Sequence, residues 1–393
     1  MGERLKLLRR QCIHDGLADV ANLAEPFLGI VSPTAVAKAG DQFAQHPVGS
    51  GPYAVVQWDA NSQIVLKRNN DYAWAQPAAR NQAAGYLDQV IFKIVPEDAT
   101  RIGGVQDGEL LAAEKVPAQL VATVQKNKNV RLFKERVTGL PYSLIFNQKQ
   151  QPWDDVRLRR AVRAALDVDT IVKTLYLGTY EQAWSAVTPG ILGYDASLEN
   201  GYRPDVAEAN RLLDEAGWNT GPNGVRVKDG KELVLRYVGG YPNNDKSYDI
   251  AQLVQQQLKK VGIKADLDVA DDVTERLTKT GAFDVYPTGT SSIDPDALSG
   301  FYSSKVLALV NGTQDLAGIA DPDIDRWLDQ GAATIDRDER AALYAKVQRK
   351  LIEQVALIPI YVSTYTVAAS TRVRGLTFDP LNEPILNGVY LAG

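Results

Sequence analysis

The side chains that most often carry out catalysis are scarce in this 393-residue chain. His14, His46 and Cys12 are its only histidines and cysteine, which leaves little for imidazole or thiolate chemistry. No G-x-S-x-G nucleophile elbow, phosphate-binding P-loop or H-E-x-x-H zinc motif occurs. Carboxylate pairs are present, but glycoside hydrolysis needs two carboxylates facing each other across a cleft, which sequence spacing does not show. The sequence therefore predicts no catalytic residue, no metal ligand and no cofactor.

Two loops have the composition of a binding site for a small polar solute. One spans residues 239–244 and the other residues 287–296, and each directly follows a predicted strand. Open α/β sheets bind ligands outside the carboxyl ends of their parallel strands, where aromatic rings can stack and polar groups can hydrogen-bond. The candidate contacts in or beside these loops are Tyr241, Asn243, Tyr286, Gly289, Thr290, Ser291 and Asp294. The alternative is that both loops are solvated turns.

The elements that would position these loops follow a strand–helix–strand pattern. Residues 232–238 predict a strand, residues 247–260 an amphipathic helix and residues 263–269 a second strand. A connection of this length indicates a βαβ unit in a mainly parallel sheet. A further strand at residues 283–286 begins another repeat of the pattern.

The first third of the chain predicts mostly strands. Residues 53–58 and 63–68 alternate around a short polar turn and predict a β-hairpin. Residues 86–96 predict a mostly buried strand because both alternating faces are largely apolar. Residues 100–109 predict a helix that its two internal glycines weaken by roughly 1 kcal/mol each.

Aspartates predict the starts of three helices. Asp154 or Asp155 would cap a helix that runs to residue 167, and Asp205 would cap one that ends before a glycine. The segment that begins at Asp321 imitates a calcium-binding loop, but it lacks the glycine and the bidentate glutamate that such loops need. It therefore predicts a third capped helix. Residues 338–354 predict a further long helix.

Composition sets the outer limits. The length predicts two domains, and 45% hydrophobic with 23% charged residues is typical of a soluble globular protein. A net charge of −5 argues against nucleic acid as a partner. No apolar run reaches the length of about 18 residues that a membrane-spanning helix needs.

Several motifs carry a resemblance to a known family. The run from His46 to Tyr53, HPVGSGPY, resembles the HPVGTGPY signature of the family 5 extracytoplasmic solute-binding proteins of ABC importers. Residues 100–109 are similar to that family's TRLxALQSGE helix, and residues 147–154 are similar to its FNTxxxPFDD segment. The motifs follow the family's order from about Gly29 to the C-terminus.

The resemblance implies an α/β, two-lobed periplasmic-binding-protein-like fold of type II, the large peptide-binding class. Residues 29–145 plus 363–393 would form lobe I, residues 146–362 lobe II, and residues 1–28 an atypical N-terminal segment. Only 45 residues precede the signature, so the family's small extra N-terminal domain is expected to be missing and lobe I incomplete. Such a lobe would expose sheet edges and apolar surface, which predicts a low melting temperature or aggregation.

The resemblance also bears on individual site residues. Trp184 lies in a segment that resembles the family's cleft-lining GxATGPLPPG, where it would either stack on the ligand or belong to the core. The loop at 287–296 resembles GW-x-x-DY-x-DP, in which an aspartate pairs with the ligand's α-ammonium group. Gly289 matches the glycine, but Thr290 replaces the tryptophan and the motif is shorter. Asp294 would then either bind ligand or, as the aspartate before proline, cap the next helix.

The resemblance finally implies a function. The chain would be the substrate-binding component of an ABC importer, capturing a peptide-like or other polar solute in an interlobe cleft and delivering it to a membrane permease. It is expected to be an extracytoplasmic monomer, in the periplasm or as a lipoprotein, although residues 1–12 lack the apolar core of a signal peptide. The alternatives are a cytoplasmic solute-sensing module of the same fold and, less favoured, a hydrolase.

Overall fold

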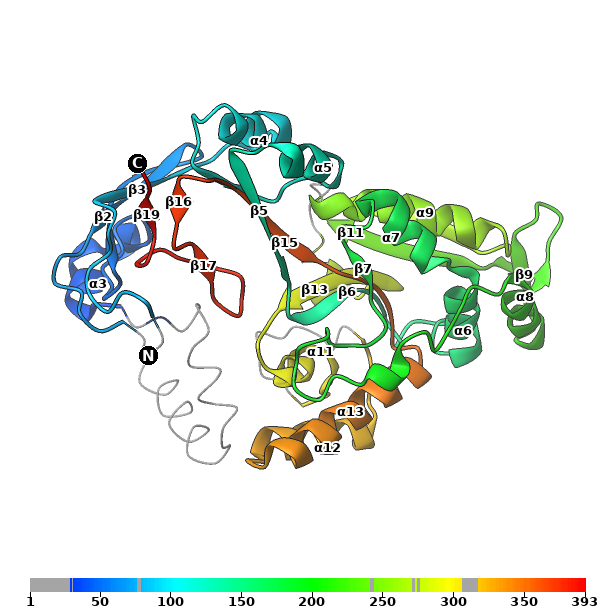
Figure 1. Ribbon diagram of the computed structural model, residues 1–393. Helices are drawn as coiled ribbons and strands as arrows, with labels where there is room; N and C mark the ends of the chain where they lie inside the picture. Colours follow the sequence, from blue (N-terminus) through cyan, green and yellow to red (C-terminus); the bar gives the residue numbers. More distant parts are fainter. Residues whose placement is uncertain are drawn as a thin grey trace. The chain divides into compact units, whose positions relative to one another are not determined.

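The chain divides into two compact units. The computed structural model describes residues 29, 31–75, 79–240, 244–270, 273, 276–305 and 317–393. Among these, unit 1 consists of residues 137–363, and unit 2 consists of residues 29–136 and 364–393 (Figure 1). The sequence predicts that the chain passes from the first lobe to the second between residues 145 and 146. In the structure the boundary between the two units lies between Arg136 and Val137.

Unit 1 is built on one six-stranded mixed sheet with the order β12-β11-β13-β6-β14-β7. Its strands are β6 (Gly139–Phe146), β7 (Glu181–Gln182), β11 (Val234–Gly240), β12 (Lys264–Ala270), β13 (Val285–Ser291) and β14 (Leu357–Val362). Strand β11 pairs in parallel with β12 and β13, which confirms the predicted parallel strand–helix–strand unit. Strand β6 runs antiparallel to both of its neighbours.

The place of β6 explains the early crossing between the units. It pairs with β13 on one side and with β14 on the other, and every position except Tyr142 is buried. Leu144 and Phe146 face one hydrophobic cluster, while Ile145 faces another. Because β6 is covered on both faces, residues 139–146 belong to unit 1.

Helices cover both faces of this sheet. One cluster packs α6, α7, α8 and α9 against it, and the other packs α11, α12 and α13. The helices are α6 (Val156–Ala165), α7 (Val168–Tyr176), α8 (Val206–Glu215), α9 (Ser247–Lys259), α11 (Ser299–Tyr302), α12 (Pro322–Ala333) and α13 (Arg337–Glu353). The short turns are η3 (Ala196–Leu198), η4 (Asn244–Lys246), the π-helical η5 (Arg276–Thr280) and η6 (Pro295–Leu298), and a small sheet comprises β8 (Asn219–Thr220), β9 (Arg226–Lys228) and β10 (Lys231–Glu232).

The predicted aspartate caps are confirmed. The Asp155 carboxylate accepts a hydrogen bond from the Arg157 amide at the start of α6, and Asp205 accepts one from the Glu208 amide at the start of α8. Asp321 caps α12.

Within the described ranges, His, Cys, Asp and Glu form no group of three or more that could hold a metal ion.

Unit 2 contains two three-stranded antiparallel sheets, with the orders β1-β2-β3 and β4-β15-β5. Its strands are β1 (Tyr53–Asp59), β2 (Gln63–Arg68), β3 (Gln89–Lys93), β4 (Ala112–Glu114), β5 (Val130–Arg136), β15 (Thr364–Ser370), β16 (Val373–Arg374), β17 (Thr377–Phe378), β18 (Pro384–Ile385) and β19 (Tyr390–Leu391). Its helices are α3 (Pro33–Ala39), η2 (Gly40–Gln45), α4 (Asp98–Gln106) and α5 (Ala118–Lys126). Strands β1 and β2 form the predicted hairpin.

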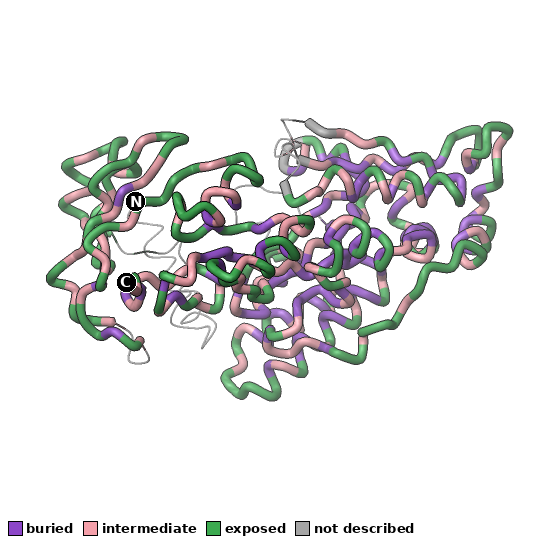
Figure 2. Tube along the Cα trace, turned by 45° about the horizontal axis from the view of Figure 1, so that its top comes forward, coloured by how far each residue is buried: buried purple, intermediate pink, exposed green. Residues whose placement is uncertain are grey.

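The predicted burial of β3 is wrong. The strand forms, but four of its five positions are exposed, including Ile91 at 48% and Phe92 at 43%. Figure 2 colours the described chain by burial. Strand β3 lies at the edge of its sheet and pairs only with β2. Phe92 lies in one cross-strand row with Ile64 and Trp58, and this apolar row stays partly open to solvent. Apolar residues on both faces therefore do not guarantee burial at an edge.

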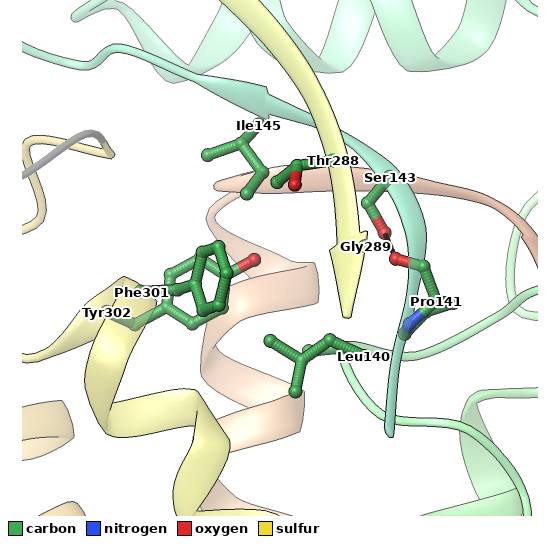
Figure 3. Close-up of a pocket in the computed structure, with 9 residues that line it drawn as sticks. Leu140, Pro141, Ser143, Ile145, Thr288, Gly289, Phe301 and Tyr302 are labelled. Carbon is green, nitrogen blue, oxygen red and sulfur yellow. Dashed lines mark hydrogen bonds between the residues drawn. The ribbon is translucent and has the colours of Figure 1, made fainter. Parts of the chain in front are cut away.

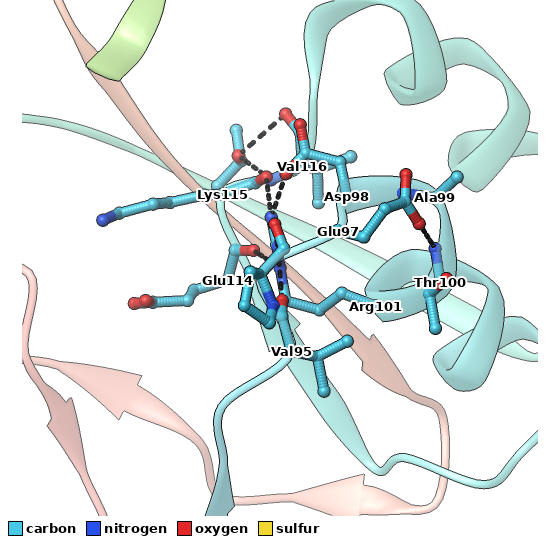
Figure 4. A network of polar contacts seen from close by, with 11 residues as sticks. Val95, Glu97, Asp98, Ala99, Thr100, Arg101, Glu114, Lys115 and Val116 are labelled. Carbon is cyan, nitrogen blue, oxygen red and sulfur yellow. Dashed lines mark hydrogen bonds and ion pairs between the residues drawn. The ribbon is translucent and has the colours of Figure 1, made fainter. Parts of the chain in front are cut away.

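Helix α4 forms despite its two glycines. The Glu97 carboxylate accepts hydrogen bonds from the amides of Ala99 at 3.0 Å and Thr100 at 2.6 Å. The Arg101 guanidinium donates to backbone carbonyls of the segments before and after the helix, including that of Val95 at 2.9 Å (Figure 4). The cap by Glu97 and the hydrogen bonds from Arg101 offset the weak helix propensity of glycine.

Candidate functional site

The candidates on β13 lie where this strand pairs with β6. Thr290 is opposite Leu140 and Ser291 is opposite Gly139, beyond an irregularity between Thr288 and Thr290. A Cβ atom on Gly289 would lie 2.8 Å from the Tyr142 amide nitrogen. Because β6 approaches so closely, packing alone requires a residue without a side chain at position 289, whether or not this position contacts a ligand.

Gly289 borders a cavity that is too small for a solute. The cavity measures about 10 Å³, which holds about one water molecule. Figure 3 shows apolar side chains from β6 and α11, such as Leu140, Ile145 and Phe301, around it. Thr290 and Ser291 are exposed at the end of the strand, whereas Tyr286 is half-buried and packs on a small cluster with Val238 and Phe283. Their contact with a ligand stays a prediction.

Asp294 has structural partners on both carboxylate oxygens. It caps η6 through the Asp296 amide at 2.8 Å, as the Asp-Pro sequence predicts. It also receives two parallel hydrogen bonds, at 2.7 and 2.8 Å, from the buried guanidinium of Arg340. A bidentate charged pair of this kind fixes the loop after β13 to α13.

Trp184 is half-buried beside another aromatic ring. Its ring lies edge-on to Tyr202, with 5.3 Å between centroids, and the Arg163 guanidinium lies 5.3 Å from the Tyr202 centroid. The segment that follows Trp184 is bonded to β6 through the Thr188 amide, which donates to the Gly139 carbonyl at 2.8 Å. Gly139 is also the partner of Ser291, so two candidate segments meet the same strand end.

The loop after β11 provides the third group of candidates. Tyr241 and Asn243 lie outside the described residues. The described part resumes at η4, whose Asp245 has backbone angles of φ 48° and ψ 38°, in the left-handed region. Non-glycine residues adopt this conformation rarely, which makes the turn a feature to explain.

A cluster of four tyrosines lies beneath this turn, and sequence reasoning missed it. We call Tyr142, Tyr176, Tyr180 and Tyr361 the tyrosine platform. Two pairs of rings are stacked, with centroids 4.2 Å apart for Tyr176–Tyr180 and 4.8 Å apart for Tyr142–Tyr361. The Tyr180 and Tyr361 centroids lie 5.1 Å apart and join the two pairs. The platform thus brings together β6, α7, the turn after α7, and β14.

The platform binds Asp245 through its hydroxyl groups. Tyr180 donates to one carboxylate oxygen at 3.1 Å and Tyr361 to the other at 2.9 Å. Tyr176 donates to the Asp245 backbone carbonyl at 2.6 Å. Burial, followed by the negative charge of Asp245, raises the pKa of all three phenols, so they remain protonated donors.

Two hydroxyls at the platform are buried beside each other, and neither makes a well-formed hydrogen bond to any other described group. They belong to Tyr142 and to Tyr237 of β11, whose residue is only 2% exposed. Burial raises the pKa of both.

A wider hollow elsewhere in unit 1 is less informative. It measures about 470 Å³ and is bordered by α6, α13 and the start of α12. The buried Arg159 donates to backbone carbonyls there, and Lys350 forms ion pairs with Asp321 and Asp323 at 3.5 Å. These groups hold the helix ends together.

Comparison with known proteins identifies the family. The model described as "Bacterial extracellular solute-binding proteins, family 5 Middle" matches residues 16–306, and the chain belongs to this family. It is a solute-binding protein of the type that ABC importers use. None of the helices in the described part of the chain has both the length and the apolar character needed to cross a bilayer.

Two curated relatives cover nearly all of this chain. The glutathione-binding protein GsiB of Shigella dysenteriae serotype 1 is 28% identical over 370 residues, which are 91% of this chain and 67% of the relative. The oligopeptide-binding protein AppA of Bacillus subtilis is 26% identical over 389 residues, which are 97% of this chain and 68% of the relative.

Solved structures agree on the fold, which is the type II peptide-binding fold. Helicobacter pylori DppA, in complex with the peptide STSA, has a TM-score of 0.78 and 24% identity, covering 95% of this chain and 70% of its own. AgaA from A. tumefaciens R10, in complex with agropinic acid, has a TM-score of 0.76 and 25% identity, covering 96% of this chain and 74% of its own.

Proposed function

We propose that this chain is the substrate-binding component of an ABC importer that captures a peptide-like or other polar solute for a membrane permease. The family match over residues 16–306 carries this proposal. Among similar proteins, GsiB is named for glutathione, AppA for oligopeptides, and AgaA was solved with agropinic acid. These solutes are all small and polar, although they differ in chemistry.

The finer points of the proposal concern place, assembly and contacts. The protein acts outside the cytoplasmic membrane as a monomer, and it binds its solute without breaking bonds. The proposed contacts are residues in or after β11 and β13 in the sequence, together with one tryptophan: Trp184, Tyr241, Asn243, Tyr286, Gly289, Thr290, Ser291 and Asp294. For Gly289 and Asp294, packing is an alternative role because both have close protein neighbours.

A thermal-shift screen tests the proposal. The panel contains glutathione, di- to pentapeptides, agropinic acid and oligosaccharides, each at up to millimolar concentration. A solute present at 100 times its dissociation constant stabilises the folded state by about 2.7 kcal/mol, which raises the melting temperature measurably. Ser291→Ala should reduce the shift, while Ser197→Ala, a change in η3, should not. No shift with any solute, and no small molecule released from the purified protein on denaturation, would overturn the proposal.

A further inference from the structure

Three buried polar side chains lie in a row along helix α13. They are four positions apart, so they share one face of the helix. Their residues are 7%, 0% and 0% exposed, and we call them the α13 stripe: Arg340, Tyr344 and Gln348. Polar groups buried to this degree are hydrogen-bonded within the protein, so their partners show what the stripe holds.

The first two members of the stripe bind the loop after β13. Arg340 donates to both carboxylate oxygens of Asp294, at 2.7 and 2.8 Å. The Tyr344 hydroxyl donates to the Asp296 carboxylate at 2.9 Å. This loop begins at the end of the strand that carries the candidate contact Ser291. Two bonds from α13 therefore determine where the loop leaves the strand.

The third member binds the segment that follows Trp184. The side-chain oxygen of Gln348 accepts the Ser185 hydroxyl at 2.8 Å and the Asp195 amide at 3.1 Å. Its side-chain nitrogen donates to the Gly193 carbonyl at 2.6 Å. A single amide group thus joins the two ends of this segment to α13.

The end of β6 holds the same two segments at a second place. The Thr188 amide donates to the Gly139 carbonyl at 2.8 Å, and the Gly139 amide donates to the Thr188 hydroxyl at 3.0 Å. The Ser292 amide donates to the Thr138 carbonyl at 3.0 Å. A Cβ atom on Gly139 would lie 2.2 Å from the Thr290 carbonyl oxygen, so the approach is very close. Each candidate segment is therefore held both by β6 and by α13.

We propose that the α13 stripe positions both candidate solute-binding segments. Arg340 and Tyr344 determine the place of Ser291, and Gln348 determines the place of Trp184. The stripe is buried and acts through these segments rather than by touching the solute. Contacts that are already in place before binding lower the entropic cost of capturing a solute. This inference rests on the proposed function, because it concerns how the contacts of that site are held.

Two matched glutamine variants test the inference by isothermal titration calorimetry. The probes are the solutes of the thermal-shift panel, beginning with glutathione, at a temperature well below the melting transition of each variant. Gln348→Met should weaken binding by about tenfold or more, because the hydrogen bonds that place the segment after Trp184 are lost. Gln257→Met makes the same change on α9, where Gln257 bonds to the Asp167 backbone, and should change the affinity by less than about twofold.

A conservative variant and hydrogen exchange separate positioning from general stability. Gln348→Glu keeps the acceptor oxygen for Ser185 and Asp195, so it should bind within about threefold of wild type. Without solute, the amides of residues 185–195 should exchange faster in Gln348→Met and at the wild-type rate in Gln257→Met.

A second variant tests the other attachment. Tyr344→Phe removes one oxygen atom and with it the hydrogen bond to Asp296. It should weaken binding several-fold and speed amide exchange in residues 291–298. If Gln348→Met does not fold, this milder variant decides, and an unchanged affinity then overturns the inference.

The outcomes separate the inference from the proposed function. Binding by Gln348→Met that is as tight as in wild type, or no weaker than in Gln257→Met, overturns the inference and leaves solute binding standing. A Gln348→Glu variant that binds as poorly as Gln348→Met also overturns it. If no solute of the panel binds to the wild-type protein, both proposals fall.

Discussion

Strand β6 of unit 1 and strand β3 of unit 2 are similarly apolar but differ in what covers them. In unit 1, β6 carries apolar side chains on both faces and is buried at every position but one. In unit 2, β3 also carries apolar side chains on both faces, yet four of its five positions are exposed. Helices pack on both sides of β6, whereas β3 is an edge strand. Burial is therefore set by partners from distant parts of the chain.

The same contrast extends to polar groups. Unit 1 buries the bidentate pair of Asp294 and Arg340, while the described ion pair between Lys93 and Glu109 in unit 2 is largely exposed. A buried charge depends on its partner, whereas an exposed charge retains water. Unit 1 thus provides the buried frame to which the candidate loop after β13 is attached.

The largest expected effect is the loss of a ring from the core of unit 1. Phe146→Ala should lower the free energy of unfolding by about 3 to 5 kcal/mol, because Phe146 is fully buried and its removal leaves a cavity. Phe92→Ala, the matched change on β3, should cost about 1 kcal/mol or less, since the ring is already partly in water. Urea unfolding of both variants measures the difference. Equal losses would contradict the contrast between the sheets.

The next effect concerns buried charge. Arg340→Met should destabilise unit 1 by about 3 kcal/mol, because it leaves the buried Asp294 carboxylate without its counterion. Lys93→Met breaks an exposed pair and should cost at most about 1 kcal/mol. The double variant Arg340→Met with Asp294→Leu should recover part of the loss in urea unfolding. No recovery would mean that Arg340 acts mainly through its packing.

Helix caps should show a smaller difference between the units. Asp205→Ala removes a 2.9 Å hydrogen bond at the start of α8 and should cost about 1 kcal/mol. Ser32→Ala removes a 3.3 Å bond at the start of the shorter α3 and should cost about 0.5 kcal/mol. Denaturation midpoints compare the two. A large loss for Ser32→Ala would show that unit 2 depends on α3 more than its exposure indicates.

The smallest effect is a dependence on pH. Burial, helped by the neighbouring Asp294 carboxylate, raises the pKa of Asp296, which therefore holds its proton more firmly in the folded state than in the unfolded one. Its contribution falls as the pH rises from the ordinary aspartate pKa near 3.8 through the raised value. Relative to wild type, Asp296→Asn should gain stability over that range. Equilibrium unfolding from pH 4 to 8 checks this, and an unchanged difference would contradict the raised pKa.

Local sequence signals predicted a large part of the fold. The parallel strand–helix–strand unit, the hairpin, and the caps Asp155, Asp205 and Asp321 depend on residues within a few positions of each other or on clear periodicity. The crossing at Arg136 and the exposure of β3 depend instead on long-range pairing and cover. A single sequence carries no local record of those partners.

The candidate site was predictable by region rather than by role. The loops after β11 and β13 could be located, but Asp294 is bonded to a guanidinium 46 residues away and the role of Gly289 depends on β6. The tyrosine platform joins residues from three segments that are far apart in the chain, so no sequence spacing predicts it. The local sequence feature closest to the platform is Asp245, which its hydroxyls bind and which directly follows a loop already selected for its composition.

The discontinuous chain of unit 2 has a consequence for the order of synthesis. Strand β15 is central in its sheet and pairs with β4 and β5, which precede it by the whole length of unit 1. At about 5 to 20 residues per second, a ribosome takes on the order of 10 to 50 s to make the intervening residues. Throughout that interval β4 and β5 lack the strand that pairs with both of them. The described part of unit 1, in contrast, is one uninterrupted stretch and can fold as it is made. Strand β15 thus completes a sheet whose other two strands are synthesised before unit 1.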